Sequence, residues 1–152
     1  PVAIALGSNL GDRQAHLAFA VERLRAPLSN LKQSSWYDTA PVGVADQPRF
    51  LNGAVIGETK LTPRALLDEL LAIESERGRA RTFAGAARTL DLDLLLFGSL
   101  QRDEPGLVIP HPRFRERLFV LEPLAELAPD WVDPVTGETI SVLLQRARSV
   151  RA

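Results

Sequence analysis

The sequence predicts an α+β fold with a ferredoxin-like βαββαβ core, an antiparallel sheet, helices packed on it and a C-terminal extension. Strand-like and helix-like hydrophobic patterns alternate in the order strand, helix, strand, strand, helix, strand. The chain has 152 residues, 45% of them hydrophobic, which suits one domain with its own core. We therefore expect residues 1–152 to form a single domain, with helices on one sheet face and the other face free for a ligand.

The first predicted strand and helix follow each other directly. Val2–Leu6 is a short apolar run that ends at Gly7, which is typical of a buried strand followed by a turn. From Asp12 to Leu28 the apolar residues recur at helical spacing, and Asp12 can act as the N-cap.

The next two predicted strands are Leu31–Tyr37, which carries Ser34, Ser35 and Trp36 in an extended pattern, and Phe50–Thr59, which carries the apolar residues Leu51, Ala54, Val55 and Ile56. The connection between them, Asp38–Pro48, contains two prolines and a glycine and is longer than a tight hairpin turn. Long connections in compact domains are often functional, so this segment is a candidate part of a binding site.

The second predicted helix has the clearest boundaries. Thr62 is a suitable N-cap, Pro63 suits the first helical position and Gly78 is a stop signal. An exposed loop is expected over 79–87 and a strand over 89–97. In the C-terminal extension, Ser141–Arg148 is a further predicted helix.

Composition excludes several kinds of chemistry. The chain has no cysteine and two histidines, so a disulfide framework, a thiolate zinc site, an iron–sulfur cluster and a cysteine nucleophile are impossible. A bound metal would need oxygen ligands, which favours Mg²⁺. The net charge of −1 gives no long-range attraction to nucleic acid or membranes. No long apolar stretch or signal peptide is evident, and we expect a cytoplasmic protein.

Two carboxylates stand out in the predicted strand over 89–97. Because strand side chains alternate between faces, Asp91 and Asp93 should share one face while the leucines around them point to the core. Their Cα atoms would lie about 6.6 Å apart, compatible with ions about 3.5–4 Å apart in a two-metal site. The alternative is a solvated strand face, but the repulsion between neighbouring carboxylates favours a bound cation.

Basic residues flank these carboxylates in the sequence. Arg79, Arg81 and Arg88 lie upstream, and His111 and Arg117 lie downstream. Cationic groups around a metal-binding carboxylate pair suit phosphoryl transfer from a nucleoside triphosphate. The alternative is that the arginines form surface ion pairs with nearby glutamates.

Two further groups of residues carry weaker signals. The loop 7–12 follows a strand and opens a helix, where backbone amides can receive an anion, although helix capping explains it equally well. Phe50, Asn52 and Phe119 could form an aromatic sandwich with a polar amide, although phenylalanines in strands and helices usually belong to the core.

Taken together, these segments resemble the 6-hydroxymethyl-7,8-dihydropterin pyrophosphokinase family over nearly the whole chain. The resembling segments are ALGSNLGD (5–12), SSWYDTAPVG (34–43), DQPRFLN (46–52), IESERGRAR (73–81), ARTLDLDLLLF (87–97) and IPHPRFRERLFVLEPL (109–124). The resemblance implies that the chain transfers the β,γ-diphosphate of ATP to the hydroxymethyl group of the pterin in folate biosynthesis and releases AMP.

The resemblance also implies roles for particular residues. Asp91 and Asp93 would bind two Mg²⁺ ions, and Arg79 and Arg88 would act in catalysis. The residues implied to line the ATP site are Glu74, Arg79, Arg81, Arg88, His111 and Arg117. The residues implied to bind the pterin are Thr39 and Val42 through their backbone, Asn52 through its amide, and Phe50 and Phe119 by stacking.

The sequence departs from the family pattern at Ala84 and Gly85, where relatives usually carry a basic residue followed by Trp or Asn.

Two other functions are alternatives to the transfer of a diphosphate to a pterin. A metal-dependent nucleotidyl transferase or cyclase could use the paired aspartates but has no need of the pterin residues. An RNA-recognition domain could share the topology, but the aspartates would repel phosphate. We expect small-molecule substrates only, no nucleic-acid or membrane partner, and a monomer.

Overall fold

The computed structural model describes residues 1–39, 49–77 and 89–151. Its main sheet has the strand order β2-β4-β1-β5, with β3 also pairing with β4, and the pairs are antiparallel. The strands are β1 (Val2–Ser8), β2 (Ser29–Gln33), β3 (Tyr37–Thr39), β4 (Phe50–Glu58) and β5 (Asp91–Phe97). The predicted α+β core is confirmed, with its second strand divided into β2 and β3.

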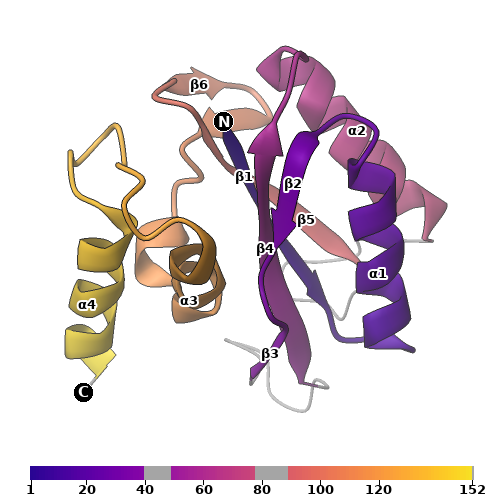
Figure 1. Ribbon diagram of the computed structural model, residues 1–152, viewed down its shortest axis with the longest axis horizontal. Coiled ribbons are helices and arrows are strands. Elements are labelled where there is room, and N and C mark those ends of the chain that lie inside the picture. Colours follow the sequence, from indigo (N-terminus) through magenta and orange to yellow (C-terminus); the bar gives the residue numbers. More distant parts are fainter. Residues whose placement is uncertain (40–48, 78–88, 152) are drawn as a thin grey trace.

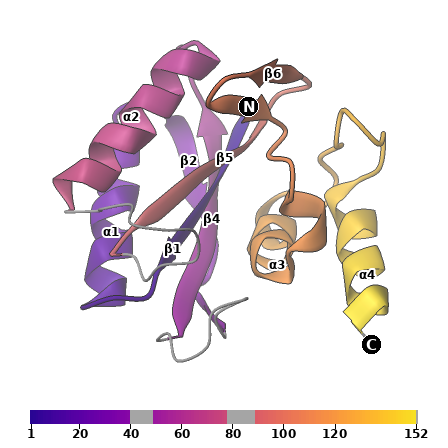
Figure 2. The same cartoon turned by 180° about the vertical axis from the view of Figure 1, so that it is seen from behind.

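Helices cover both faces of this sheet (Figures 1 and 2). On one face lie α1 (Arg13–Leu24) and α2 (Pro63–Glu76), and on the other lie α3 (Leu118–Leu127) and α4 (Ile140–Arg151). Between β5 and α3 the chain forms a small hairpin, β6 (Arg102–Glu104) and β7 (Leu107–Ile109), and a 3₁₀ turn (Phe114–Glu116).

Each face of the sheet has its own hydrophobic core. Along β1, Ile4 and Leu6 pack into the core beneath α1 and α2, whereas Ala3 and Ala5 pack into the core beneath α3 and α4. The expectation that the second face would be free was wrong, because α3 buries its apolar side chains against it and α4 packs on α3. Only the end of this face, beyond Ala5, is left for polar side chains.

Both predicted helix starts are confirmed. The Asp12 carboxylate accepts a hydrogen bond from the Ala15 amide at 3.1 Å, and the Thr62 hydroxyl accepts one from the Ala65 amide at 3.2 Å. The first helix ends at Leu24 rather than Leu28. Pro27 explains the difference, because a proline disfavours helical backbone in the residue before it. Gly78, the expected stop of the second helix, lies outside the described residues.

The predicted strand over 31–37 is interrupted at Ser34. The Ser34 hydroxyl accepts a hydrogen bond from the Ala54 amide at 2.9 Å. The Trp36 ring covers Gly53 so closely that a Cβ there would lie 2.3 Å from it. These two contacts bend the chain between β2 and β3 and bring β3 beside the start of β4. The predicted strand over 89–97 begins at Asp91, and the last predicted helix is confirmed as α4.

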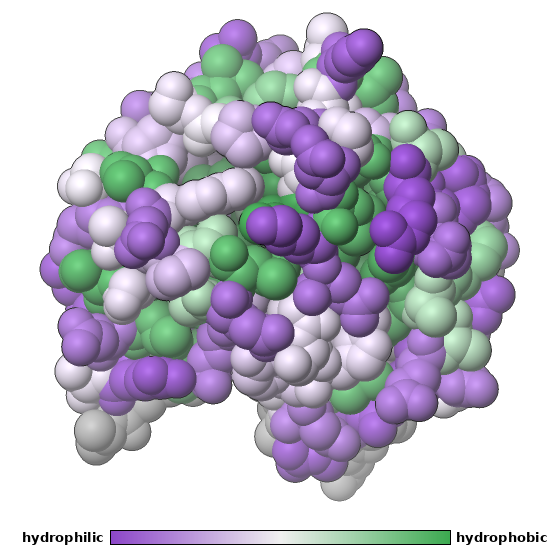
Figure 3. Space-filling view, viewed as in Figure 1, coloured by the Kyte–Doolittle hydropathy of each residue, from purple (hydrophilic) through white to green (hydrophobic). Residues whose placement is uncertain are grey.

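The surface seen in the orientation of Figure 1 mixes hydrophilic and hydrophobic side chains (Figure 3). A notch opens at its lower edge, between the layer formed by α3 and α4 and the strands β3 and β4. The polar residues expected to bind ligands come from elements near this edge.

Candidate functional site

The two aspartates lie on the sheet face that carries α3 and α4. Asp91 is the cross-strand neighbour of Gly7, and Asp93 is that of Ala5, so both project on the same side as Ala5. Both are half-buried. The leucines that alternate with them are buried in the opposite core: Leu90, Leu92 and Leu94. The expected shared face is therefore present in the structure.

Glu74 supports this strand from the opposite layer. It lies near the end of α2, is only 3% exposed, and its carboxylate accepts a hydrogen bond from the Leu92 amide at 2.7 Å. Leu92 stands between the two aspartates, so Glu74 anchors the backbone that carries both of them. A hydrogen bond between a buried carboxylate and an amide is charge-assisted and strong.

His111 lies just after β7, close to the aspartates. Its backbone amide donates to the Leu95 carbonyl at 3.0 Å, and its Nδ1 accepts from the Arg113 amide at 3.3 Å. Burial, followed by the nearby Arg117 charge, lowers the pKa of His111, although Asp91 acts in the opposite direction. At neutral pH the ring is therefore uncharged, and because Nδ1 accepts a hydrogen bond, the proton is on Nε2.

Arg117 and Phe119 form a cation–π pair at the start of α3. The Arg117 guanidinium lies 5.6 Å from the centre of the Phe119 ring, and both side chains are half-buried. This stacking orients the guanidinium while leaving it charged. The pair therefore places an aromatic ring and a positive charge side by side at the beginning of this helix.

Asn52 is held between two strands and over a glycine. It is 6% exposed, and its amide nitrogen donates to the Thr39 hydroxyl at 2.5 Å. A Cβ added at Gly7 would lie 2.8 Å from Asn52 Oδ1 and 3.8 Å from the Phe50 ring, so both side chains cover Gly7. The structure thus brings together Thr39, Phe50 and Asn52 as expected. It also adds Gly7, which lies within β1 and which the sequence had indicated only as part of the loop 7–12 and of the segment 5–12.

The carboxylates and the amide share one row across the sheet. Asp91 pairs with Gly7, and Gly7 pairs in turn with Asn52 on its other side. Since neighbouring strands are about 4.8 Å apart, the backbones at Asp91 and Asn52 are separated by about 10 Å. A carboxylate and a polar amide therefore flank Gly7, one on each neighbouring strand.

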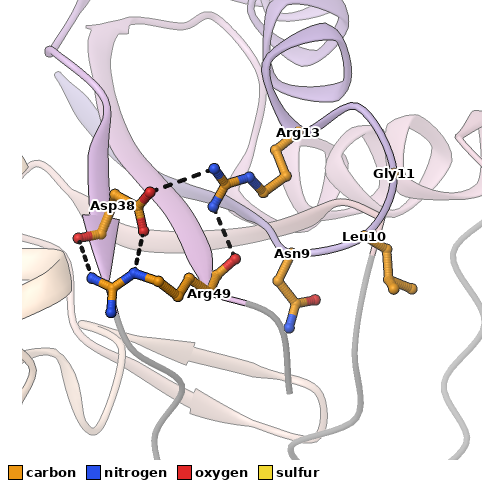
Figure 4. A pocket seen from close by; sticks show the side chains of 6 residues that line it. All are labelled: Asn9, Leu10, Gly11, Arg13, Asp38 and Arg49. Carbon is orange, nitrogen blue, oxygen red and sulfur yellow. Dashed lines mark hydrogen bonds and ion pairs between the residues drawn. The ribbon is translucent and has the colours of Figure 1, made fainter. Parts of the chain in front are cut away.

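A pocket of about 400 Å³ opens where β1 leads into α1 (Figure 4). Its lining residues are Asn9, Leu10, Gly11, Arg13, Asp38 and Arg49. Arg49 donates to the Asp38 carboxylate at 2.7 Å and to the Asp38 carbonyl at 3.2 Å, and Arg13 donates to the Arg49 carbonyl at 3.0 Å. The hydrogen bond from Arg49 lowers the pKa of Asp38.

Neither Asp38 nor Arg49 is among the site residues expected from the sequence, although each directly precedes an expected pterin residue, Thr39 or Phe50. The pairing was not visible in the sequence because the two charges come together only when β3 pairs with β4.

Several expected site residues lie outside the described part of the chain: Val42, Arg79, Arg81 and Arg88, together with Ala84 and Gly85. Within residues 1–39, 49–77 and 89–151, no group of three or more His, Asp or Glu side chains is arranged to hold a metal ion. Mg²⁺ is commonly held by one or two carboxylates together with substrate phosphates and water. The hard oxygen donors of Asp91 and Asp93, on one half-exposed face, fit that pattern.

Comparisons with known proteins agree on one family. The sequence model of 7,8-dihydro-6-hydroxymethylpterin-pyrophosphokinase (HPPK) matches residues 3–129. A Bacillus subtilis protein named 2-amino-4-hydroxy-6-hydroxymethyldihydropteridine pyrophosphokinase is 50% identical over 126 residues, 82% of this chain and 75% of that protein. The Synechocystis protein of the same name is 43% identical over 145 residues, 94% of this chain and 74% of its own length.

The solved structures agree on the fold. The crystal structure of a Plasmodium falciparum HPPK-DHPS triple mutant with pteroate superposes with a TM-score of 0.79 at 16% identity. The match covers 98% of this chain and 43% of that one. In the described part of this chain, no helix has both the length and the apolar character needed to cross a bilayer.

Proposed function

Because the chain belongs to the 7,8-dihydro-6-hydroxymethylpterin-pyrophosphokinase family, we propose that it transfers the β,γ-diphosphate of ATP to the hydroxymethyl group of 6-hydroxymethyl-7,8-dihydropterin. The observation that carries the proposal is the row Asp91–Gly7–Asn52 across three strands. It sets a carboxylate suited to metal-bound phosphates beside an amide suited to the polar edge of a pterin.

The pterin half of the site is built on β3, β4 and α3. The Asn52 amide, fixed by Thr39, can donate to and accept from the pterin's amide-like edge. Phe50 and Phe119 would stack on its two faces, and the backbone at Thr39 and Val42 would complete the edge contacts. A ring between two aromatic side chains gains dispersion and is shielded from water.

The ATP half of the site is built around β5. Two Mg²⁺ ions held by Asp91 and Asp93 would neutralise the phosphate charge and lower the pKa of the attacking alcohol. Glu74 keeps the two aspartates in place through the Leu92 amide. Arg117 supplies a positive charge, and His111 a neutral Nε2–H donor, for phosphate oxygens, while Arg79, Arg81 and Arg88 would hold the remaining phosphate charge.

The reaction is a displacement at the β-phosphorus. The hydroxymethyl oxygen forms a bond to this phosphorus, and the bond from the phosphorus to the bridging oxygen of the α-phosphate breaks. AMP leaves with that oxygen and with the electron pair of the broken bond. Asp91, the carboxylate nearest the pterin half, is the candidate to accept the alcohol's proton.

Isothermal calorimetry with a non-hydrolysable ATP analogue and the pterin tests the proposal. With Mg²⁺ and the analogue present, the pterin is expected to bind at one site, and binding of the analogue should weaken strongly when Mg²⁺ is removed. Failure of the pterin to bind even with nucleotide and Mg²⁺ present would remove the main support. Release of pyrophosphate during turnover with ATP would favour a nucleotidyl transferase instead.

A further inference from the structure

A cluster of hydrogen bonds joins strand β3 to helix α3. The Glu126 carboxylate accepts from the Ser35 amide at 2.9 and 3.1 Å, from the Ser35 hydroxyl at 3.2 Å and from the Tyr37 hydroxyl at 2.7 Å. One side chain at the end of the helix thus receives three donors from residues 35–37, where the chain enters β3. None of these residues takes part directly in the proposed chemistry. Their hydrogen bonds instead hold the start of β3 against α3.

The charge states at this cluster favour strong hydrogen bonds. Burial raises the pKa of Glu126, but the hydrogen bonds from Tyr37 and Ser35 outweigh it, and the net pKa lies below the ordinary value. Burial and the same hydrogen bond raise the pKa of Tyr37 to about 12. At neutral pH, an ionised carboxylate therefore accepts from a protonated phenol, and such charge-assisted bonds are shorter and stronger than neutral ones.

On the strand side, the cluster is next to the residues expected to bind the pterin. Tyr37 is the cross-strand neighbour of Asn52, and Thr39 is that of Phe50. The Thr39 hydroxyl also accepts the hydrogen bond from the Asn52 amide. Since alternate strand residues share a face, Tyr37 and Thr39 project together, one toward Glu126 and the other toward Asn52.

On the helix side, the cluster lies two turns from Phe119. At about 3.6 residues per turn, Phe119 and Glu126 occupy the same face of α3. This helix packs against β4, the strand that carries Phe50 and Asn52. Figure 1 shows α3 beside β4, with β3 at the lower end of that strand. A tie between Glu126 and β3 therefore controls how α3 sits relative to β4.

We propose that Glu126 is a positioning residue for the pterin. By holding β3 through Ser35 and Tyr37, it sets the separation between Phe119 on the helix and the pair Phe50 and Asn52 on the sheet. This inference rests on the proposed function, because it assigns to Glu126 the geometry of the pterin half of that site. The carboxylates of the metal and phosphate half, Asp91 and Asp93, lie on β5, which β1 separates from β4, so the tie does not touch them.

Steady-state kinetics on two conservative variants test the inference. Glu126→Gln keeps the shape of the side chain but loses the charge, and Tyr37→Phe removes one donor. Each should raise KM and Kd for the pterin about tenfold, because loss of the tie lets Phe119 move relative to Phe50 and Asn52. KM for ATP should rise less, because Asp91 and Asp93 on β5 are not held by the tie. Because both changes break the same contact, the double variant should bind the pterin no more weakly than Glu126→Gln alone.

Glu138→Gln is the matched control, because it removes the charge of a carboxylate that pairs with Arg146 in the C-terminal region. Pterin KM should stay at the wild-type value in this variant. If Glu126→Gln leaves pterin KM unchanged, or raises KM for ATP equally, the positioning role is refuted. If Glu126→Gln does not fold, Ser35→Ala and Tyr37→Phe decide the matter by the same readouts. Failure of the wild type to bind the pterin would instead contradict the proposed function itself.

Discussion

Replacing Gly7 with alanine should selectively weaken pterin binding. A Cβ at this position would lie 2.8 Å from Asn52 Oδ1, whereas ordinary contacts begin near 3.4 Å, so the amide oxygen must retreat by about 0.6 Å. The backbone at Gly7 does not have a positive φ, so alanine fits the strand itself. The strain therefore falls on the Asn52 side chain and on its hydrogen bond to Thr39.

The expected loss of pterin affinity follows from the hydrogen bonds that the displaced Asn52 amide would make to the pterin. Misplacing the amide by this much should cost about one hydrogen bond to the pterin, worth about 1–2 kcal/mol. That loss corresponds to an increase of about 5- to 30-fold in the Kd of the pterin. ATP affinity should change by less than about twofold, because the atoms nearest the added Cβ belong to Asn52 and Phe50 on β4, whereas Asp91 and Asp93 lie on β5 at the other edge of β1.

The assay is calorimetric titration of the variant with the pterin in the presence of Mg²⁺ and a non-hydrolysable ATP analogue. Gly57→Ala is the matched control, since its Cβ would meet the Ser29 carbonyl at 3.0 Å, at the far end of the same strand pair. The control should lose stability while keeping its pterin affinity. Wild-type affinity in Gly7→Ala, or an equal loss in Gly57→Ala, would refute the reasoning.

Three further changes probe other parts of the account. Asp93→Ala should lower the rate of AMP formation by about 1,000-fold while the protein stays folded, and an active variant would contradict the metal role. Asp133 is fully buried and accepts a hydrogen bond from Arg115 at 2.9 Å. Asp133→Ala should therefore lower the free energy of unfolding by about 3 kcal/mol, which corresponds to a fall of about 6–12 °C in Tm. A smaller fall in Tm would show that water replaces the carboxylate. Burial and, second, the Arg77 charge lower the pKa of His16 in the folded protein. Between that pKa and the ordinary value of about 6.5, the unfolded state binds more protons than the folded state does. The free energy of unfolding should therefore fall as the pH drops through this range. His16→Asn, which can still accept from Arg77, should flatten this dependence in urea titrations across pH, and an unchanged slope would contradict it.

The parts of the fold that depend on local spacing could be predicted from the sequence. The shared face of Asp91 and Asp93 follows from the two-residue period of a strand, and the helix starts at Asp12 and Thr62 follow from capping chemistry. The cover on the second sheet face could not be predicted in the same way. Helix α3 contains Pro123 and follows an arginine-rich turn, so its local pattern did not indicate a helix that packs on a sheet.

The parts of the site that depend on residues far apart in the sequence could not be predicted from local patterns either. Gly7 matters because of Asn52, and the two residues meet only when β1 pairs with β4. Likewise, Glu126 lies far along the chain from Tyr37, and nothing in the spacing of either residue indicates the other. The resemblance to a known family supplied the pterin residues, whereas physical patterns alone favoured a core role for Phe50 and Phe119.

The central claim is that a diphosphate, rather than a single phosphate or a nucleotide, moves from ATP to the pterin. Phosphorus NMR of a reaction containing the protein, Mg²⁺, ATP and 6-hydroxymethyl-7,8-dihydropterin measures this directly. AMP and the pterin diphosphate are expected in equal amounts, with no AMP when the pterin is omitted. Formation of ADP or free pyrophosphate as the main product, or AMP release that does not depend on the pterin, would contradict it.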